Sequence, residues 1–226
     1  MLNLFSNNKS IIDAKVLQEL LDEILTPKLQ QIGLTKSTNY SWHEQTLKEI
    51  RHGFTYNLLK GSSGTFTWGV NLDFLPILHG DKIEYHRTAK KYTHHLFEWA
   101  NEYSNSFFGG QMKNGVTTHF GFKEAKKSIT ILFERYEQSI IQWFDTAKTI
   151  ENLVDITERQ IKTGNHYNIH SPSPKYILPF LYAKKHQVDK AIELFNKLEL
   201  FHFDNNESAK EKVKAKLLLL TEKNCM

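Results

Sequence analysis

Three histidines and a glutamate lie close enough along the chain to suggest metal chemistry. His94 and Glu98 are four residues apart, so on a helix they would share one face, and imidazole with carboxylate is a donor set that binds zinc. His95 is adjacent, and His86 could supply a further ligand. The stretch HHLFE nevertheless lacks the zinc-protease motif, which needs two histidines four apart with a glutamate directly after the first. A metal-dependent enzyme or small-ligand binder using His86, His94, His95 and Glu98 is therefore the alternative interpretation, and we expect no metal site.

Other catalytic chemistries find little support in the sequence. The single cysteine, Cys225, is the penultimate residue, which is a poor place for a positioned thiolate. The sequence contains no G-x-S-x-G motif of a serine hydrolase. Its glycine pairs, Gly61 with Gly64 and Gly109 with Gly110, lack the strand-to-helix setting of a phosphate loop or dinucleotide fingerprint. We expect no enzymatic activity and no cofactor.

Polar and aromatic side chains in the middle of the chain indicate binding to another macromolecule. Tyr, Trp, Arg and His are among the residue types found at recognition surfaces, and they occur in two stretches, RHGFTYNLLK (51–60) and TFTWGVNLDFL (65–75). An ordinary solvated sheet face is the alternative reading of the same residues. The predicted contacts with a partner are Trp42, His43, Arg51, Tyr56, Asn71 and Asp73.

These side chains have to be positioned by a β region that follows an N-terminal helix. Apolar residues at helical spacing predict a helix over 10–31, with Ser10 as its N-cap. Strands are predicted over 38–45, 51–60 and 65–75, and the glycines of 61–64 favour a hairpin between the last two. The last strand alternates strictly between an apolar face, Phe66, Trp68, Val70, Leu72 and Phe74, and a more polar face, Thr65, Thr67, Gly69, Asn71 and Asp73.

Two later segments carry helical spacing of different strength. Residues 88–103 are predicted to be a helix with Thr88 as its N-cap. Residues 123–144 fit either a helix or two β-branched strands. We expect at least one strand ending near Phe144, because Asp145 resembles the N-cap of a following helix over 146–162.

The last part of the chain reads as helices that follow a Ser-Pro-Ser-Pro break at 171–174. A helical hairpin is predicted over 175–185 and 188–200, and a final helix over 207–223. This stretch is short for a core of its own, so we expect it to dock on the preceding body. The expected domain organisation is an α+β domain over 1–170, with docked C-terminal helices over 171–226.

Composition and charge exclude several classes of protein. The 226 residues are 40% hydrophobic and 24% charged, an ordinary globular mixture. The formal charge of +4 is interspersed along the chain, and lysines 210, 212, 214 and 216 would spread around a helix instead of forming a stripe, so nucleic-acid binding is not expected. The sequence has neither a secretory signal nor an apolar run of about 18 residues, which favours a cytoplasmic protein without a membrane partner.

The stretches ILTPKLQQIGL and GTFTWGVNLDF, followed by a helical C-terminal half, resemble a group of bacterial domains of unknown function. Some of those domains are suspected immunity proteins encoded beside toxins. The resemblance covers residues 15–165, departs at Leu34, where the relatives carry phenylalanine, and does not include the C-terminal hairpin. It implies a protein that neutralises a cognate bacterial toxin by occluding it. The expected fold is α+β, with an antiparallel sheet of three to five strands covered by helices.

Overall fold

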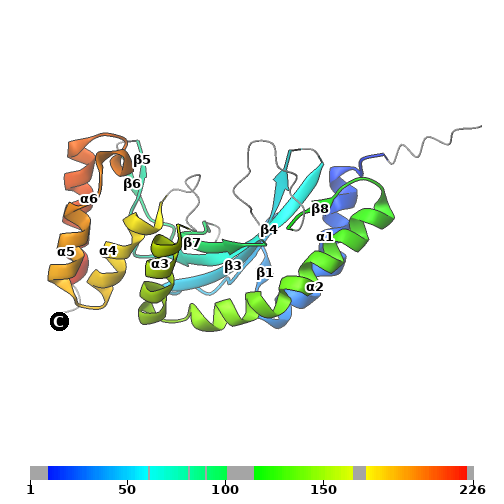
Figure 1. Ribbon diagram of the computed structural model, residues 1–226, viewed down its shortest axis with the longest axis horizontal. Helices are drawn as coiled ribbons and strands as arrows, with labels where there is room; N and C mark the ends of the chain where they lie inside the picture. The colour runs from blue at the N-terminus through cyan, green and yellow to red at the C-terminus, as the bar shows by residue number, and fades with distance from the viewer. Residues whose placement is uncertain are drawn as a thin grey trace, which may run out of the picture. The chain divides into compact units, whose positions relative to one another are not determined.

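A computed structural model describes residues 10–60, 62–80, 82–89, 91–100, 115–164 and 172–222. In these residues the fold is α+β, with a curled antiparallel sheet and six α-helices (Figure 1). The chain divides into two compact units, described separately below. The first unit comprises Met1–Glu44, Gly53–Trp68 and Glu98–Ile141, and the second comprises Gln45–His52, Gly69–Phe97 and Gln142–Met226.

The main sheet runs in the order β1-β2-β3-β4-β7, and β8 pairs with the start of β4. Five strands form the path of this sheet, within the expected three to five, and β8 is a further strand beside β4 in the described part of the chain. The structure confirms the two long predicted strands and the hairpin that joins them. Their residues alternate along the chain, and such alternation is a local signal of a strand that needs no knowledge of distant residues. The strands are β1 (Thr35–Lys36), β2 (Ser41–His43), β3 (Ile50–Leu59), β4 (Ser63–Leu72), β7 (Leu96–Trp99) and β8 (Thr117–Thr118).

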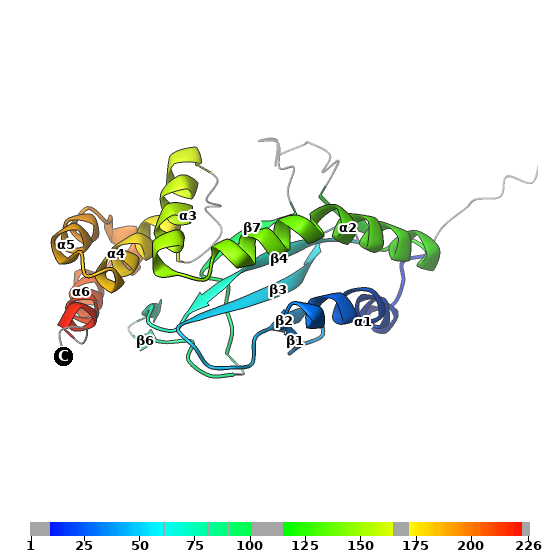
Figure 2. The ribbon, with the colours of Figure 1, turned by 90° about the horizontal axis from the view of Figure 1, so that it is seen from below.

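The first unit packs α1 (Ala14–Gln31) and most of α2 (Phe122–Thr146) with the strands. The predicted first helix is confirmed, although it begins at Ala14 with Asp13 as its N-cap, not at Ser10. Its buried stripe consists of Leu17, Leu20, Leu21, Leu25 and Leu29. Helices α1 and α2 lie side by side (Figure 2), joined by ion pairs from Lys28 to Glu137 at 3.0 Å and from Lys126 to Glu23 at 2.5 Å.

The expectation of a strand ending near Phe144 is wrong, because α2 is helical throughout. Its buried apolar residues, including Ile129, Phe133 and Ile140, recur at helical spacing, and burying that stripe outweighs the weak strand preference of β-branched residues. Asp145 lies inside this helix and caps nothing. Helix α3 (Ile150–Thr163) begins instead after Thr149, whose side chain accepts a hydrogen bond from the Asn152 backbone N–H.

The predicted helix over 88–103 is also wrong. Residues 96–99 form strand β7, and 88, 89 and 91–95 belong to no helix or strand. Backbone N–H groups of His95 and Ala100 donate to the carbonyls of Val70 and Phe66, both at 2.8 Å, as an antiparallel partner of β4 does. This added strand leaves β4 buried along almost its whole length, including its polar face. Residues 101–103 of the predicted helix lie outside the described residues.

The C-terminal part of the second unit confirms the predicted helical hairpin and the final helix. Helix α4 packs against α3, α5 and α6, which explains why nearly all of its residues are buried. The expected organisation, an α+β domain over 1–170 with the helices of 171–226 docked on the same body, stays a prediction. The elements are α4 (Pro174–Lys184), α5 (Val188–Asn196), the short 3₁₀ helix η1 (Leu200–Phe203) and α6 (Glu207–Glu222). Among the described helices, none has the length and apolar character needed to cross a bilayer.

Candidate metal centre

A small hairpin in the second unit places a histidine and a glutamate on one face. Strands β5 (Ile77–His79) and β6 (Lys82–Glu84) are antiparallel, with Ile77 opposite Glu84 and His79 opposite Lys82. Because side chains alternate along each strand, His79 and Glu84 share a face as diagonal neighbours, within reach of long side chains. Gly80, at φ +59°, supplies the positive φ that a tight hairpin connection requires.

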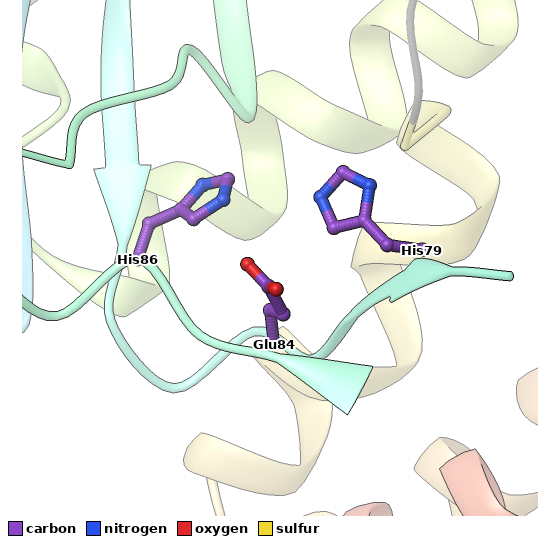
Figure 3. A group of neighbouring side chains, drawn as sticks. All are labelled: His79, Glu84 and His86. Atoms are coloured by element: carbon purple, nitrogen blue, oxygen red, sulfur yellow. The ribbon is translucent and has the colours of Figure 1, made fainter. Parts of the chain in front are cut away.

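His86, two residues after Glu84, completes a group of three metal-ligating side chains. One donor atom from each of His79, Glu84 and His86 lies within 4.8 Å of the other two. Figure 3 shows the two imidazoles and the carboxylate pointing toward one another. Ligands at zinc bond lengths are roughly 3.3 Å apart in a tetrahedral site, so shifts of less than about 1 Å per side chain would close the group around an ion.

The protonation states of this group suit a cation. Burial lowers the pKa of His86, and the nearby His79 and Lys91 lower it further, so this imidazole is neutral at neutral pH. A hydrogen bond from the Lys91 ammonium, at 3.2 Å, lowers the pKa of Glu84 and keeps its carboxylate ionised. Neutral imidazole and ionised carboxylate are the forms that bind metal. An incoming ion would have to compete with Lys91 for this carboxylate.

The imidazole of His86 has no hydrogen bond on one buried side. Its Nδ1 atom is buried and, within the described residues, lacks a hydrogen-bond partner. The other two ligands are more accessible, since His79 is exposed and Glu84 is half-buried. Since no hydrogen bond of the described residues at Nδ1 sets the tautomer, the ring is free to present a lone pair to an ion.

Two of the predicted partner contacts, Arg51 and Asn71, are interior residues of this unit. Both are fully buried. The Arg51 guanidinium donates to the side-chain oxygen of Asn71 at 3.0 Å, and to the backbone carbonyls of His86, Thr88 and Lys91 at 3.0, 3.0 and 2.7 Å. They therefore act on the segment that carries His86 and offer no surface to a partner.

The histidine and glutamate set predicted from the sequence is only partly brought together. His95 stacks on His86, with ring centroids 5.5 Å apart, and its Nδ1 accepts the Leu72 backbone N–H at 2.9 Å. Burial lowers the pKa of His95 to about 3, so it stays neutral. His94 contacts the Tyr92 hydroxyl at 3.2 Å. Among the described residues, neither His94 nor Glu98, in β7, joins the group of converging donors.

The remaining predicted partner contacts also lie mostly beneath the surface. Trp42, His43 and Tyr56 are buried, and the Trp42 indole N–H donates to Thr26 at 3.0 Å. Asp73 alone is half-buried, and burial raises the pKa of its carboxyl group. Five of the six predicted contacts are thus interior in this structure. Sequence reasoning missed His79 and Glu84. The turn at Gly80 could have suggested a hairpin, but the register that brings the two side chains together has no signal in the sequence.

The buried contact of Tyr56 with His119 in the first unit predicts a pH dependence of stability. The Tyr56 hydroxyl lies 2.7 Å from Nε2 of His119, and burial lowers the pKa of His119 below its ordinary value of about 6.5. The unfolded chain then binds this proton more readily. The part of the free energy of unfolding that depends on neutral His119 is therefore fully present above about pH 6.5, and it decreases as the pH falls below that value. His119→Gln, which keeps a hydrogen-bonding side chain, should reduce that loss.

Urea unfolding of the wild type and His119→Gln at about pH 7.5 and about pH 5 measures the effect. We expect a smaller drop between the two pH values for the variant. An equal drop for both proteins would show that His119 does not contribute to the acid sensitivity.

Comparisons of the chain with protein-family models, with curated proteins and with solved structures found no match.

Proposed function

We propose that this protein binds a divalent transition-metal ion of the zinc class through His79, Glu84 and His86. The observation that carries the proposal is the convergence of three donor atoms within 4.8 Å. Two imidazoles and one carboxylate form a ligand set that catalytic zinc sites use. The lowered pKa values of His86 and Glu84 remove the competition from protons at neutral pH.

Three protein ligands leave at least one coordination position for water or a small ligand. Structural zinc sites are usually closed by four protein ligands, whereas catalytic sites keep a position open. A bound ion of this kind acts as a Lewis acid and brings the pKa of coordinated water to about 7. Because His79 is exposed, the open side of the site faces solvent. The proposal is thus a metal-dependent site that takes a small ligand, not a structural ion that completes the fold.

Calorimetric titration of metal-free protein with Zn²⁺ at about pH 7.5 tests the proposal. We expect one ion per chain for the wild type. His79→Ala, Glu84→Gln and His86→Ala should each weaken binding by at least about 100-fold, because each removes a direct ligand.

His94→Ala is the matched control, since it removes a nearby histidine that lies outside the converging group. Its affinity should equal that of the wild type. Absence of binding by the wild type would overturn the proposal. So would a loss of binding in His94→Ala with none in His79→Ala, because the ligands would then be those predicted from the sequence.

Toxin neutralisation stays a prediction that rests on the resemblance of residues 15–165. It can no longer rely on Trp42, His43, Arg51, Tyr56 or Asn71 as contacts, because these side chains are buried. A neighbouring gene that encodes a toxic C-terminal domain would support this prediction, and a metabolic operon would count against it.

A further inference from the structure

A single buried arginine holds the chain segment that contributes His86, and we infer that Arg51 is a positioning residue of the metal centre. The inference rests on the proposed metal binding and adds a residue that is not one of the three ligands. Arg51 acts through the backbone of the residues that carry the site.

Four hydrogen bonds define this role. Nη1 of Arg51 donates to the Thr88 carbonyl at 3.0 Å. Nη2 donates to the carbonyls of His86 at 3.0 Å and Lys91 at 2.7 Å, and to the Asn71 side chain at 3.0 Å. A guanidinium offers five N–H donors in a rigid plane, whereas a lysine ammonium offers three on one atom. A lysine with three N–H groups could therefore not serve all four of these acceptors.

Two of the bonded carbonyls belong to residues that contribute directly to the proposed site. His86 is a ligand, and the Lys91 ammonium donates to the ligand Glu84. Backbone around His86, Thr88 and Lys91 lies outside the strands, so ladder hydrogen bonds do not fix its path. Arg51 thus sets the position of one ligand and of the cation beside another.

Rigid strands hold Arg51 itself. It is the second residue of β3, and Asn71 lies near the end of β4. The Asn71 amide also donates to the Thr93 carbonyl at 3.3 Å, so it orients Arg51 and secures the far part of the same segment. Side chains of two long strands therefore anchor an irregular segment, an arrangement that keeps metal ligands in place without making them part of the sheet.

The test compares the wild type with Arg51→Lys in two measurements, Zn²⁺ affinity and the visible absorption of bound Co²⁺. The absorption bands report coordination geometry, which a purely structural role of Arg51 would not change. Although His79, Glu84 and His86 are all retained, we expect Arg51→Lys to bind about 10–100-fold more weakly and to shift the Co²⁺ bands. Asn71→Ala, which keeps the arginine but removes a partner that orients it, should change both quantities in the same direction by a smaller amount.

Thr26→Val is the control for lost stability. It removes the acceptor of the Trp42 indole N–H in the first unit and should lower stability without moving the Co²⁺ bands. Wild-type affinity and bands in both Arg51→Lys and Asn71→Ala would overturn the inference and leave the metal site standing. If Arg51→Lys does not fold, Asn71→Ala decides by the same criteria. Failure of the wild type to bind Co²⁺ or Zn²⁺ would refute the proposed function, and with it the role of Arg51.

Discussion

Replacement of Gly69 by alanine should lower the free energy of unfolding by more than about 3 kcal/mol, or prevent folding. Gly69 lies in β4, where β7 approaches its backbone. A Cβ atom at this position would overlap the Leu96 carbonyl oxygen and the Phe97 Cβ, and would lie 2.9 Å from the Phe97 Cα. Because the obstacles are mainly backbone atoms, rotation of a side chain cannot relieve the clash. Urea unfolding followed by circular dichroism measures the loss.

Gly33→Ala is the matched control for Gly69→Ala. Gly33 has φ +84°, and a Cβ there would meet no atom within 4 Å. Backbone strain alone should cost about 1–2 kcal/mol. Equal and small losses of stability in the two variants would contradict the close approach of the β7 backbone to Gly69.

Phe54→Ala should cost about 3–5 kcal/mol, because it opens a cavity at the centre of the first unit. Phe54 is fully buried, and its ring centroid lies 5.1, 5.9 and 6.0 Å from those of Phe66, Phe133 and Trp42. Chemical denaturation measures this loss. Leu58→Ala, on the same strand, is the control, since Leu58 is 53% exposed and its truncation should change stability by less than about 0.5 kcal/mol. Equal effects of the two substitutions would contradict the assignment of the core.

The elements that were predicted correctly are those whose pattern is local and complete. Strict alternation over 65–75 identified β4, and the apolar periodicity of α1 and the C-terminal helices needed no knowledge of distant residues. Of the two wrong predictions of elements, the segment 123–144 has a pattern that fits both a helix and a strand, whereas 88–103 was predicted from helical spacing alone. In 88–103, pairing with β4 determines that residues 96–99 form a strand. Gly69 makes this pairing possible, because it has no side chain and leaves room for the β7 backbone.

The candidate site was harder to predict, for a related reason. His79 and Glu84 come together only through the register of a short hairpin, which no spacing rule along the sequence expresses. The buried positions of Arg51 in β3 and Asn71 in β4 were missed because the polar side chains of both strands were expected on an exposed face that binds a partner. Arg51 and Asn71 bond to the irregular segment that follows β6, and the sequence did not reveal that this segment returns to the sheet.

Anomalous diffraction from crystals grown with Zn²⁺ tests the central claim most directly. We predict an anomalous peak about 2.0–2.3 Å from one nitrogen each of His79 and His86 and from a carboxylate oxygen of Glu84. A peak beside His94 and Glu98 instead would contradict the claim. So would the absence of a peak at His79, Glu84 and His86 in crystals grown with saturating Zn²⁺.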